Sequence, residues 1–185
     1  MYATNNNCQA KESRSRIVSA LFCLMHEYQY KEITVTQICQ QAQIARQTFY
    51  RNFDLKDDII EFYLNDLVKR YFADYYQEGD ALIQLNSFFT YMLEHKEFLL
   101  LASINDFSFM INQTIASKIT KFINLQQLTT IRDPELESYV TGFIASTISS
   151  LLSLWVENEF KESPEKIAHL AKRFLEGLSS NDDFF

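Results

Sequence analysis

Three consecutive side chains, Arg46, Gln47 and Thr48, carry the most specific chemistry in this sequence. An arginine can donate two hydrogen bonds to guanine, a glutamine can pair with adenine, and a threonine offers a hydroxyl and a methyl group. At the leading end of a short helix, these groups would suit the major groove of duplex DNA. The alternative is a helical hairpin whose polar face is only exposed to water.

The surrounding residues predict the helix pair that would present this triplet. Thr34 is a good N-cap, because its hydroxyl can accept a hydrogen bond from an amide of the following turn. Three apolar residues follow it at helical spacing: Val35, Ile38 and Ala42. A second short helix is expected over about 45–52, with Phe49 and Phe53 anchoring it from behind.

Residues 34–56 resemble the DNA-binding domain of TetR-family transcriptional regulators, whose pattern runs roughly T-V-x-x-I-A-x-x-A-G-V-S-x-x-T-x-Y-x-H-F-x-x-K. The matching positions are Thr34, Val35, Ile38, Ala42, Ile44, Thr48, Tyr50, Phe53 and Lys56. The resemblance covers about the first third of the chain and implies a homodimer on a palindromic operator in double-stranded DNA. The DNA-contacting residues then expected are Thr34, Thr36, Arg46, Gln47, Thr48, Tyr50, Arg51, Asn52 and Lys56.

Four positions depart from that pattern. Gln43 replaces a turn glycine, at a backbone position that often needs a positive φ. Ala45 removes the hydroxyl cap of the second helix, a loss of roughly 1 kcal/mol. Asn52 replaces a histidine but can still donate a hydrogen bond to a phosphate, and Cys39 conservatively replaces a small apolar residue. Lys56, in the first turn of the next helix, is expected to hold a phosphate together with free backbone amides.

The charge of the chain is distributed unevenly. The formal net charge is -7, which by itself argues against a nucleic-acid partner. Residues 1–56, however, contain seven Lys and Arg against four Asp and Glu, whereas residues 57–185 contain ten against twenty. This asymmetry fits a basic DNA-binding head, 1–56, on an acidic body, 57–185, that dimerises and can bind a ligand.

Composition predicts an all-α fold. The chain has only three Gly and two Pro, and its apolar residues recur with a period near 3.6. No signal peptide is visible, the first 13 residues are expected to form a frayed polar tail, and a first helix is expected over 13–28. Three cysteines, Cys8, Cys23 and Cys39, provide no disulfide framework and suit a reducing cytoplasm.

The rest of the chain predicts a helical body. A long helix is expected from about 54 to 77 with Leu55 on its apolar stripe, followed by helices over 81–94, 97–105 and 107–125 and a loop through 132–134. Residues 138–156 carry no charge and approach the length of a membrane span, but seven of them are Ser or Thr. A helix buried between other helices, without a membrane, is therefore expected there. Ser163 and Pro164 begin a final amphipathic helix.

In TetR-like proteins the last two helices form a four-helix bundle with the same pair of a second subunit. These two helices resemble that pair. The interface residues then expected are Phe143, Leu151, Trp155, Leu170 and Phe174.

Aromatic residues are dense in the body, where the resemblance implies a pocket for a small apolar ligand. The residues expected to line it are Phe88, Phe89, Met92, Phe107, Met110 and Phe122. Ordinary core packing produces the same spacing, so both interpretations stay open.

The three Gly supply no phosphate loop and the His and Cys have no zinc spacing, so neither an enzyme, a cofactor nor a metal is expected. The alternative function is a helical ligand-binding or protein-interaction module that acts without DNA.

Overall fold

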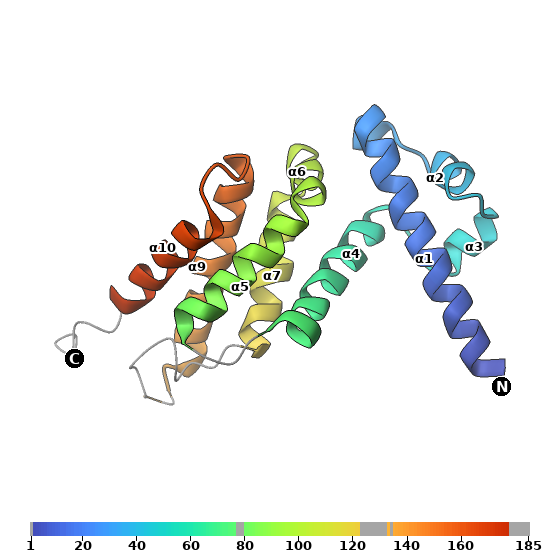
Figure 1. Ribbon diagram of the computed structural model, residues 1–185. Helices are drawn as coiled ribbons and strands as arrows, with labels where there is room; N and C mark the ends of the chain where they lie inside the picture. Colours follow the sequence, from blue (N-terminus) through green and yellow to red (C-terminus); the bar gives the residue numbers. More distant parts are fainter. Residues whose placement is uncertain (1, 77–79, 123–132, 134, 178–185) are drawn as a thin grey trace. The chain divides into compact units, whose positions relative to one another are not determined.

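The computed structural model describes residues 2–76, 80–122, 133 and 135–177, with side chains from residue 9 onward and none over 120–122. Throughout these residues the protein is all-α, as expected (Figure 1). The chain divides into two compact units, Met1–Tyr63 and Leu64–Phe185. The division falls inside α4, Asp57–Arg70. The assignment of DNA binding to 1–56 and of dimerisation to 57–185 stays a prediction.

The first unit is a helical head. It comprises α1 (Tyr2–Glu27), the 3-10 turn η1 (Tyr30–Glu32), α2 (Val35–Gln41), α3 (Arg46–Tyr50) and the first half of α4. The residues that α1, α2, α3 and the first half of α4 bury completely are Ile17, Leu21, Ile38, Phe49, Ile59 and Ile60. Helix α1 begins at Tyr2, so the segment expected as a frayed tail is part of the helix.

The start of α4 differs from the expected helix. Asp58 Oδ2 accepts hydrogen bonds from the amides of Asp54, at 3.0 Å, and Leu55, at 2.8 Å. The carboxylate therefore holds residues 54 and 55 in a turn before the helix. Leu55 is 64% exposed instead of lying on the apolar stripe. At its other end, α4 passes into a π-helical turn, η2 (Tyr71–Tyr75), where one continuous helix was expected.

The second unit contains α5 (Ala81–Glu94), α6 (Lys96–Ile104), α7 (Ser108–Phe122), α9 (Glu137–Glu157) and α10 (Pro164–Gly177). These bounds agree with the expected helices to within a few residues. Helix α7 packs along α9, and α10 packs along α5. The expected cap of the last helix is confirmed, because Ser163 Oγ accepts a hydrogen bond from the amide of Lys166 at 3.3 Å. Most of the expected 132–134 loop lies outside the described residues.

Helix α9 is buried on one face only. Ile144, Ile148 and Leu152 are buried, whereas Phe143 on the other face is 52% exposed. By length and composition α9 is apolar enough to cross a membrane, the one such helix among the described residues. Helix α9 is thus less buried within a single chain than expected, because its second face exposes apolar side chains.

Candidate nucleic-acid interface

The helix α2 begins at a capping box. Thr34 Oγ1 accepts a hydrogen bond from the Gln37 amide at 3.2 Å, and Gln37 Oε1 accepts one from the Thr34 amide at 2.8 Å. The expected N-cap is therefore confirmed. These reciprocal bonds fix the start of a seven-residue helix that would be marginal in isolation. Thr34 and Thr36 are both exposed, and their DNA contacts stay predictions.

The turn between α2 and α3 places Gln43 at a φ of 53°. The expectation of a positive φ at this position is confirmed, with glutamine in place of glycine. Arg16 Nη2 donates a hydrogen bond to the Gln43 carbonyl at 2.9 Å, which ties the turn to α1. Beside the turn, Cys39 is buried at the end of α2, whereas Cys23 on α1 is exposed. The hydrogen bond from Arg16 and the burial of Cys39 thus hold the turn between α2 and α3 in place.

Helix α3 and the residues just after it bury aromatic side chains in the core of the head. Phe49 is fully buried and Phe53, just after the helix, is almost so, which confirms their expected role as anchors. Arg46 and Gln47 are exposed and Thr48 is half-buried. Ala45 supplies no side-chain cap, as its sequence implied. The outward face of α3 therefore consists of hydrogen-bonding side chains on a rigid support.

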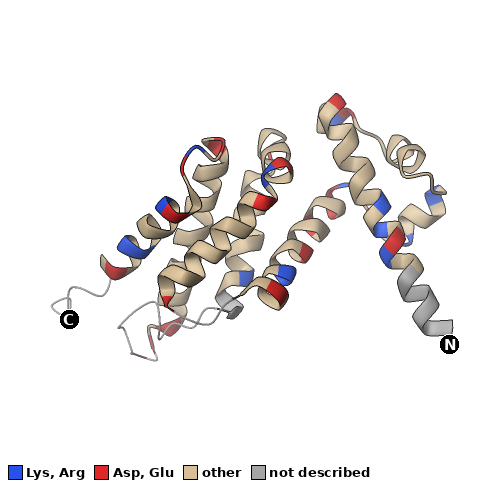
Figure 2. Cartoon of the chain, in the orientation of Figure 1, with Lys and Arg blue, Asp and Glu red and all other residues tan. Residues whose placement is uncertain are grey.

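Basic residues accompany α3 (Figure 2). Lys11, Arg14 and Arg16 lie on α1, which packs against α3. The guanidinium of Arg46 donates a hydrogen bond to the Tyr50 hydroxyl oxygen, which raises the pKa of Arg46. The head therefore presents a permanently positive surface beside the helix that would read DNA.

Lys56 is directed at the protein itself. Its Nζ donates hydrogen bonds to the carbonyls of Tyr30, at 2.7 Å, and Ile33, at 2.8 Å, and lies 4.3 Å from the centre of the Tyr30 ring. Burial lowers the pKa of Lys56, and the Tyr30 hydroxyl donates to the carboxylate of Asp57. The free amides expected nearby are bound to Asp58. Lys56 thus joins η1 to α4, and its contact with a DNA phosphate stays a prediction.

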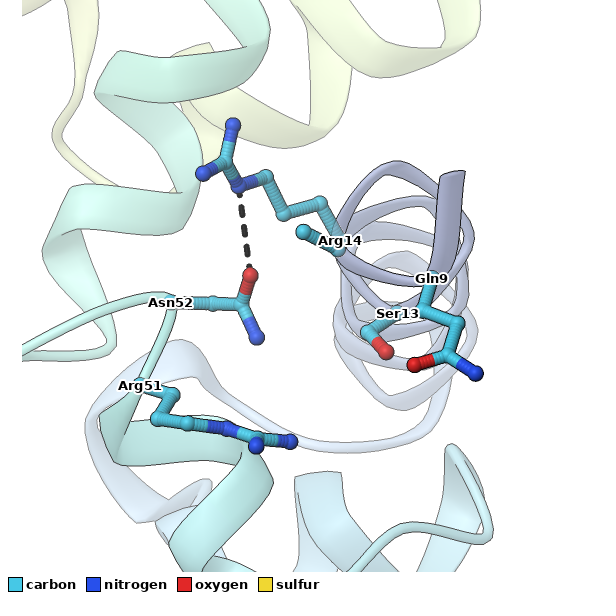
Figure 3. Close-up of a pocket in the computed structure, with 6 residues that line it drawn as sticks. Gln9, Ser13, Arg14, Arg51 and Asn52 are labelled. Atoms are coloured by element: carbon cyan, nitrogen blue, oxygen red, sulfur yellow. Dashed lines mark hydrogen bonds between the residues drawn. The ribbon is translucent and has the colours of Figure 1, made fainter. Parts of the chain in front are cut away.

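Arg51 and Asn52 follow α3 and line a pocket of about 210 Å³ against α1 (Figure 3). The complete lining is Gln9, Ala10, Ser13, Arg14, Arg51 and Asn52. Gln9, Ala10 and Ser13 were not expected in a site because residues 1–13 were expected to form a frayed tail, and Arg14 was expected only as part of the first helix. The helical spacing of Gln9 and Ser13 was the signal that could have identified them.

The expected ligand-pocket residues whose side chains are described belong to the second unit, and four of them lie in its core. Phe88, Phe89, Met92 and Phe107 are buried, and Met110 is half-buried. Phe89 packs edge-on against Trp155, with 5.8 Å between ring centres. The side chain of Phe122 lies outside the described residues. These contacts are those of a packed core, and a ligand pocket stays a prediction.

The expected dimer residues divide into two groups. Phe143, Leu170 and Phe174 are exposed, and Leu151 is half-buried. Trp155 is only 3% exposed, and its Nε1 donates to the Glu162 carbonyl at 2.9 Å, so it belongs to the core of its own chain. Two exposed apolar residues on α9, Tyr139 and Leu154, were missed by the sequence analysis. The remaining residues form an apolar surface over α9 and α10.

This architecture, a helical head with a helix-turn-helix and a separate helical body, defines a class of transcriptional regulators. The family model described as "Transcriptional regulator C-terminal region", TetR_C_8, matches residues 80–177, more than half of the chain. The chain therefore belongs to the TetR family of transcriptional regulators. No curated protein sequence matches it significantly.

Several solved structures share the fold. The dihydroxyacetone kinase operon activator DhaS aligns with a TM-score of 0.63 and 20% identity, over 89% of this chain and 94% of DhaS. A TetR-family regulator from Streptomyces coelicolor gives 0.56 and 17%, over 91% and 80%. Thermus thermophilus FadR, a TetR-family repressor solved with lauroyl-CoA, gives 0.52 and 18%, over 93% and 98%. At these identities the similarity establishes the fold.

Proposed function

We propose that this regulator binds a palindromic operator as a homodimer, with α3 in the major groove. The proposal is supported above all by α3, which has one buried face and one exposed polar face. Phe49 is fully buried behind it, whereas Arg46 and Gln47 are exposed. A reading helix must hold its base-contacting side chains on a rigid support, and this arrangement provides one.

The apolar surface of α9 and α10 supports a dimer. Its large exposed side chains are Tyr139, Phe143, Leu154, Leu170 and Phe174. They lie on two helices that contact each other, and exposed apolar side chains gathered in this way support a protein interface. A two-fold axis through this surface would present two heads in opposite senses, which is the symmetry of a palindrome.

Charge distribution supports the orientation on DNA. The basic excess of residues 1–56 attracts phosphates, and the acidic excess of residues 57–185 is repelled by them. The head therefore approaches DNA first. The protein would act without a catalytic cofactor and in the cytoplasm, where its DNA target is found.

We further propose repression relieved by a small apolar effector. A dimer seated on a promoter excludes polymerase without needing any contact to it. The likeness in fold to FadR, which was solved with lauroyl-CoA, supports the proposal. In the second unit the Ser153 hydroxyl is buried and has no hydrogen-bond partner among the described residues. The effector must bind the DNA-free state more tightly.

Selection of bound genomic fragments followed by footprinting tests the proposal. We expect one protected site with two inverted half-sites about 10 base pairs apart, or a multiple of that spacing. An unsymmetrical protected site would contradict the dimeric arrangement. Failure to enrich any fragment would favour the alternative, a helical ligand-binding or protein-interaction module that acts without DNA.

A further inference from the structure

His95 lies at the junction of α5 and α6. At the end of α5 its amide donates a hydrogen bond to the Met92 carbonyl at 3.1 Å, and at the start of α6 its carbonyl accepts one from the Leu99 amide at 3.2 Å. The imidazole lies against the Tyr91 ring, with 4.8 Å between ring centres. Because the side chain is half-buried, a charge on the imidazole would be only partly hydrated.

Tyr91 connects this junction to the end of α4. Its hydroxyl donates a hydrogen bond to the Leu67 carbonyl at 3.1 Å. The centre of its ring lies 4.6 Å from that of Tyr75 and 5.5 Å from that of Tyr71, and both of these tyrosines belong to the π-helical turn η2. Such turns are rare and occur frequently at functional sites. The imidazole of His95 is therefore one side chain away from the point at which α4 changes its winding.

The elements around His95 carry charged residues of both signs. They are Arg70 and its ion-pair partner Asp66 on α4, Asp74 on η2, Glu94 on α5, and Lys96 and Glu97 at the start of α6. Burial, followed by the Arg70 guanidinium, lowers the pKa of His95, whereas Glu94 raises it. The phenols of the neighbouring tyrosines stay protonated at the pH values at which histidine titrates. A proton on His95 would thus be placed beside a guanidinium.

We propose that protonation of His95 releases the end of α4 from α5 and thereby weakens operator binding, so that the regulator responds to acidification. The inference rests on the proposed DNA-binding function and adds the proton as a regulatory ligand. An imidazolium is repelled by the Arg70 guanidinium, and movement of the α4 end relieves that repulsion. Helix α4 belongs to both compact units, because the division follows Tyr63, so a change at its end acts on a helix that the head shares.

The direction of the pH effect follows from proton linkage. If the pKa of His95 is lower in the DNA-binding form than in the released form, release takes up a proton. Operator affinity should therefore fall as the pH falls below the ordinary histidine pKa of 6.5. With one His95 in each subunit of a dimer, the slope of log affinity against pH should approach about two. Protons bound elsewhere make the head more positive and strengthen DNA binding, so the two effects have opposite signs.

His95→Gln in the full-length protein tests the proposal. Affinity for an operator duplex is measured at constant salt between about pH 7.5 and 5.5, where the wild type should lose about 10- to 100-fold. His95→Gln should lose far less, and any pH dependence that persists belongs to other groups, because His26 and His169 remain. Arg70→Gln should also lose less than the wild type, because the repulsion is absent. The control is Lys161→Gln, which removes the same charge from an exposed position between α9 and α10 and should match the wild type.

Circular dichroism checks that each protein stays folded over this pH range, so that lost affinity is not lost structure. If the wild-type affinity does not fall with pH, or if His95→Gln falls equally, the inference fails while the proposed function stands.

A second measurement separates the two proposals. If the wild type binds no DNA at any pH, the proposed function fails, and amide hydrogen exchange then tests the release of α4 itself. Protection factors at residues 67–75, which correct for the intrinsic effect of pH, should fall on acidification in the wild type and stay constant in His95→Gln. Equal protection in both proteins at every pH would overturn the inference.

Discussion

Some residues of the head act through neighbours in the sequence, and others act through residues far away in the chain. The Thr34 cap and the positive φ of Gln43 depend on neighbours within a few positions, and both were predicted. The role of Lys56 depends on the carbonyls of Tyr30 and Ile33, more than twenty residues earlier. No helical periodicity encodes that contact, so the sequence suggested a phosphate ligand instead.

Gln43 should slightly lower the stability of the head, because its φ is positive. A residue without glycine's freedom costs about 1 kcal/mol or more in the left-handed region, and a β-branched residue costs more. We therefore expect Gln43→Gly to raise the midpoint of thermal unfolding slightly and Gln43→Val to lower it. Calorimetry on the three proteins checks the order. A glycine variant less stable than the valine variant would contradict the backbone argument.

Lys56→Met should destabilise the head without changing how DNA binding depends on salt. The variant keeps an apolar chain but loses charge-assisted hydrogen bonds to two carbonyls, which are worth about 1.5–3 kcal/mol each before partial exposure is discounted. Urea unfolding measures the stability, and binding over a salt series measures the phosphate count. A flatter slope of log affinity against log salt in Lys56→Met would instead support a phosphate contact by Lys56.

Arg46→Ala and Gln47→Ala should each relax base preference at one position of every half-site. The expected cost is roughly 1–3 kcal/mol for each lost bidentate contact. We propose Tyr50 as a phosphate contact, which carries no base information, so Tyr50→Ala should weaken binding to all sequences about equally. Binding to a library of operator variants separates the two patterns. A uniform loss in the Arg46 variant would remove that residue from base recognition.

The two helices of the helix-turn-helix are too short to be stable in isolation. Helices α2 and α3 contain seven and five residues, well below the length at which isolated helices are stable. Their stability comes from the core in which Phe49 and Phe53 are anchored. The sequence predicted these helices because their apolar spacing is strong. It misplaced both ends of α4, which depend on the carboxylate of Asp58 and on the π-helical turn η2.

Phe49→Ala should therefore unfold the head selectively. Removal of a fully buried phenylalanine costs about 3–5 kcal/mol. Operator binding should disappear in gel shift, while sedimentation shows an unchanged dimer, because the second unit has its own core. Loss of the dimer together with DNA binding would show that the two units fold as one.

A half-buried histidine gives the second unit a pH dependence. Burial, with Arg70 as a further cause, lowers the pKa of His95 below its ordinary 6.5. The unfolded chain then binds more protons than the folded one as pH falls below about 6.5, so stability falls with it. The thermal midpoint should drop between pH 7 and 5.5, and less steeply in His95→Gln. Equal slopes in both proteins would exclude His95 as the source.

At the scale of the whole molecule, the fold class followed from composition and period, but the faces of the helices did not. Trp155 and Phe143 both lie on the uncharged α9, yet one is buried in the core and the other exposed. Only the packing of α9 on α7 and of α10 on α5 separates them. The sequence could thus indicate a dimerising helix pair without fixing which residues are available to a partner.

Phe174→Glu and Leu154→Glu should each yield a monomer. Both residues are exposed in the single chain, at 53% and 54%, so the substitutions should spare folding and place a charge in the proposed interface. Sedimentation at micromolar concentration measures the state, and operator affinity should fall with it. Lys161→Gln again serves as the control. Two dimeric glutamate variants would move the interface elsewhere.

Two of the three thiols of the head, those of Cys23 and Cys39, differ in exposure and can therefore report on its opening. Cys23 is exposed and Cys39 is buried beside the turn into α3, and burial raises the pKa of the Cys39 thiol. In a protein carrying Cys8→Ser, a thiol reagent should consume Cys23 rapidly and Cys39 only when the head opens. The slow phase then measures the opening equilibrium of the recognition turn. Because a ligand that binds only the closed head suppresses opening in proportion to its saturation, operator DNA should slow that phase, and labelling of one buried sulfur would report occupancy in solution.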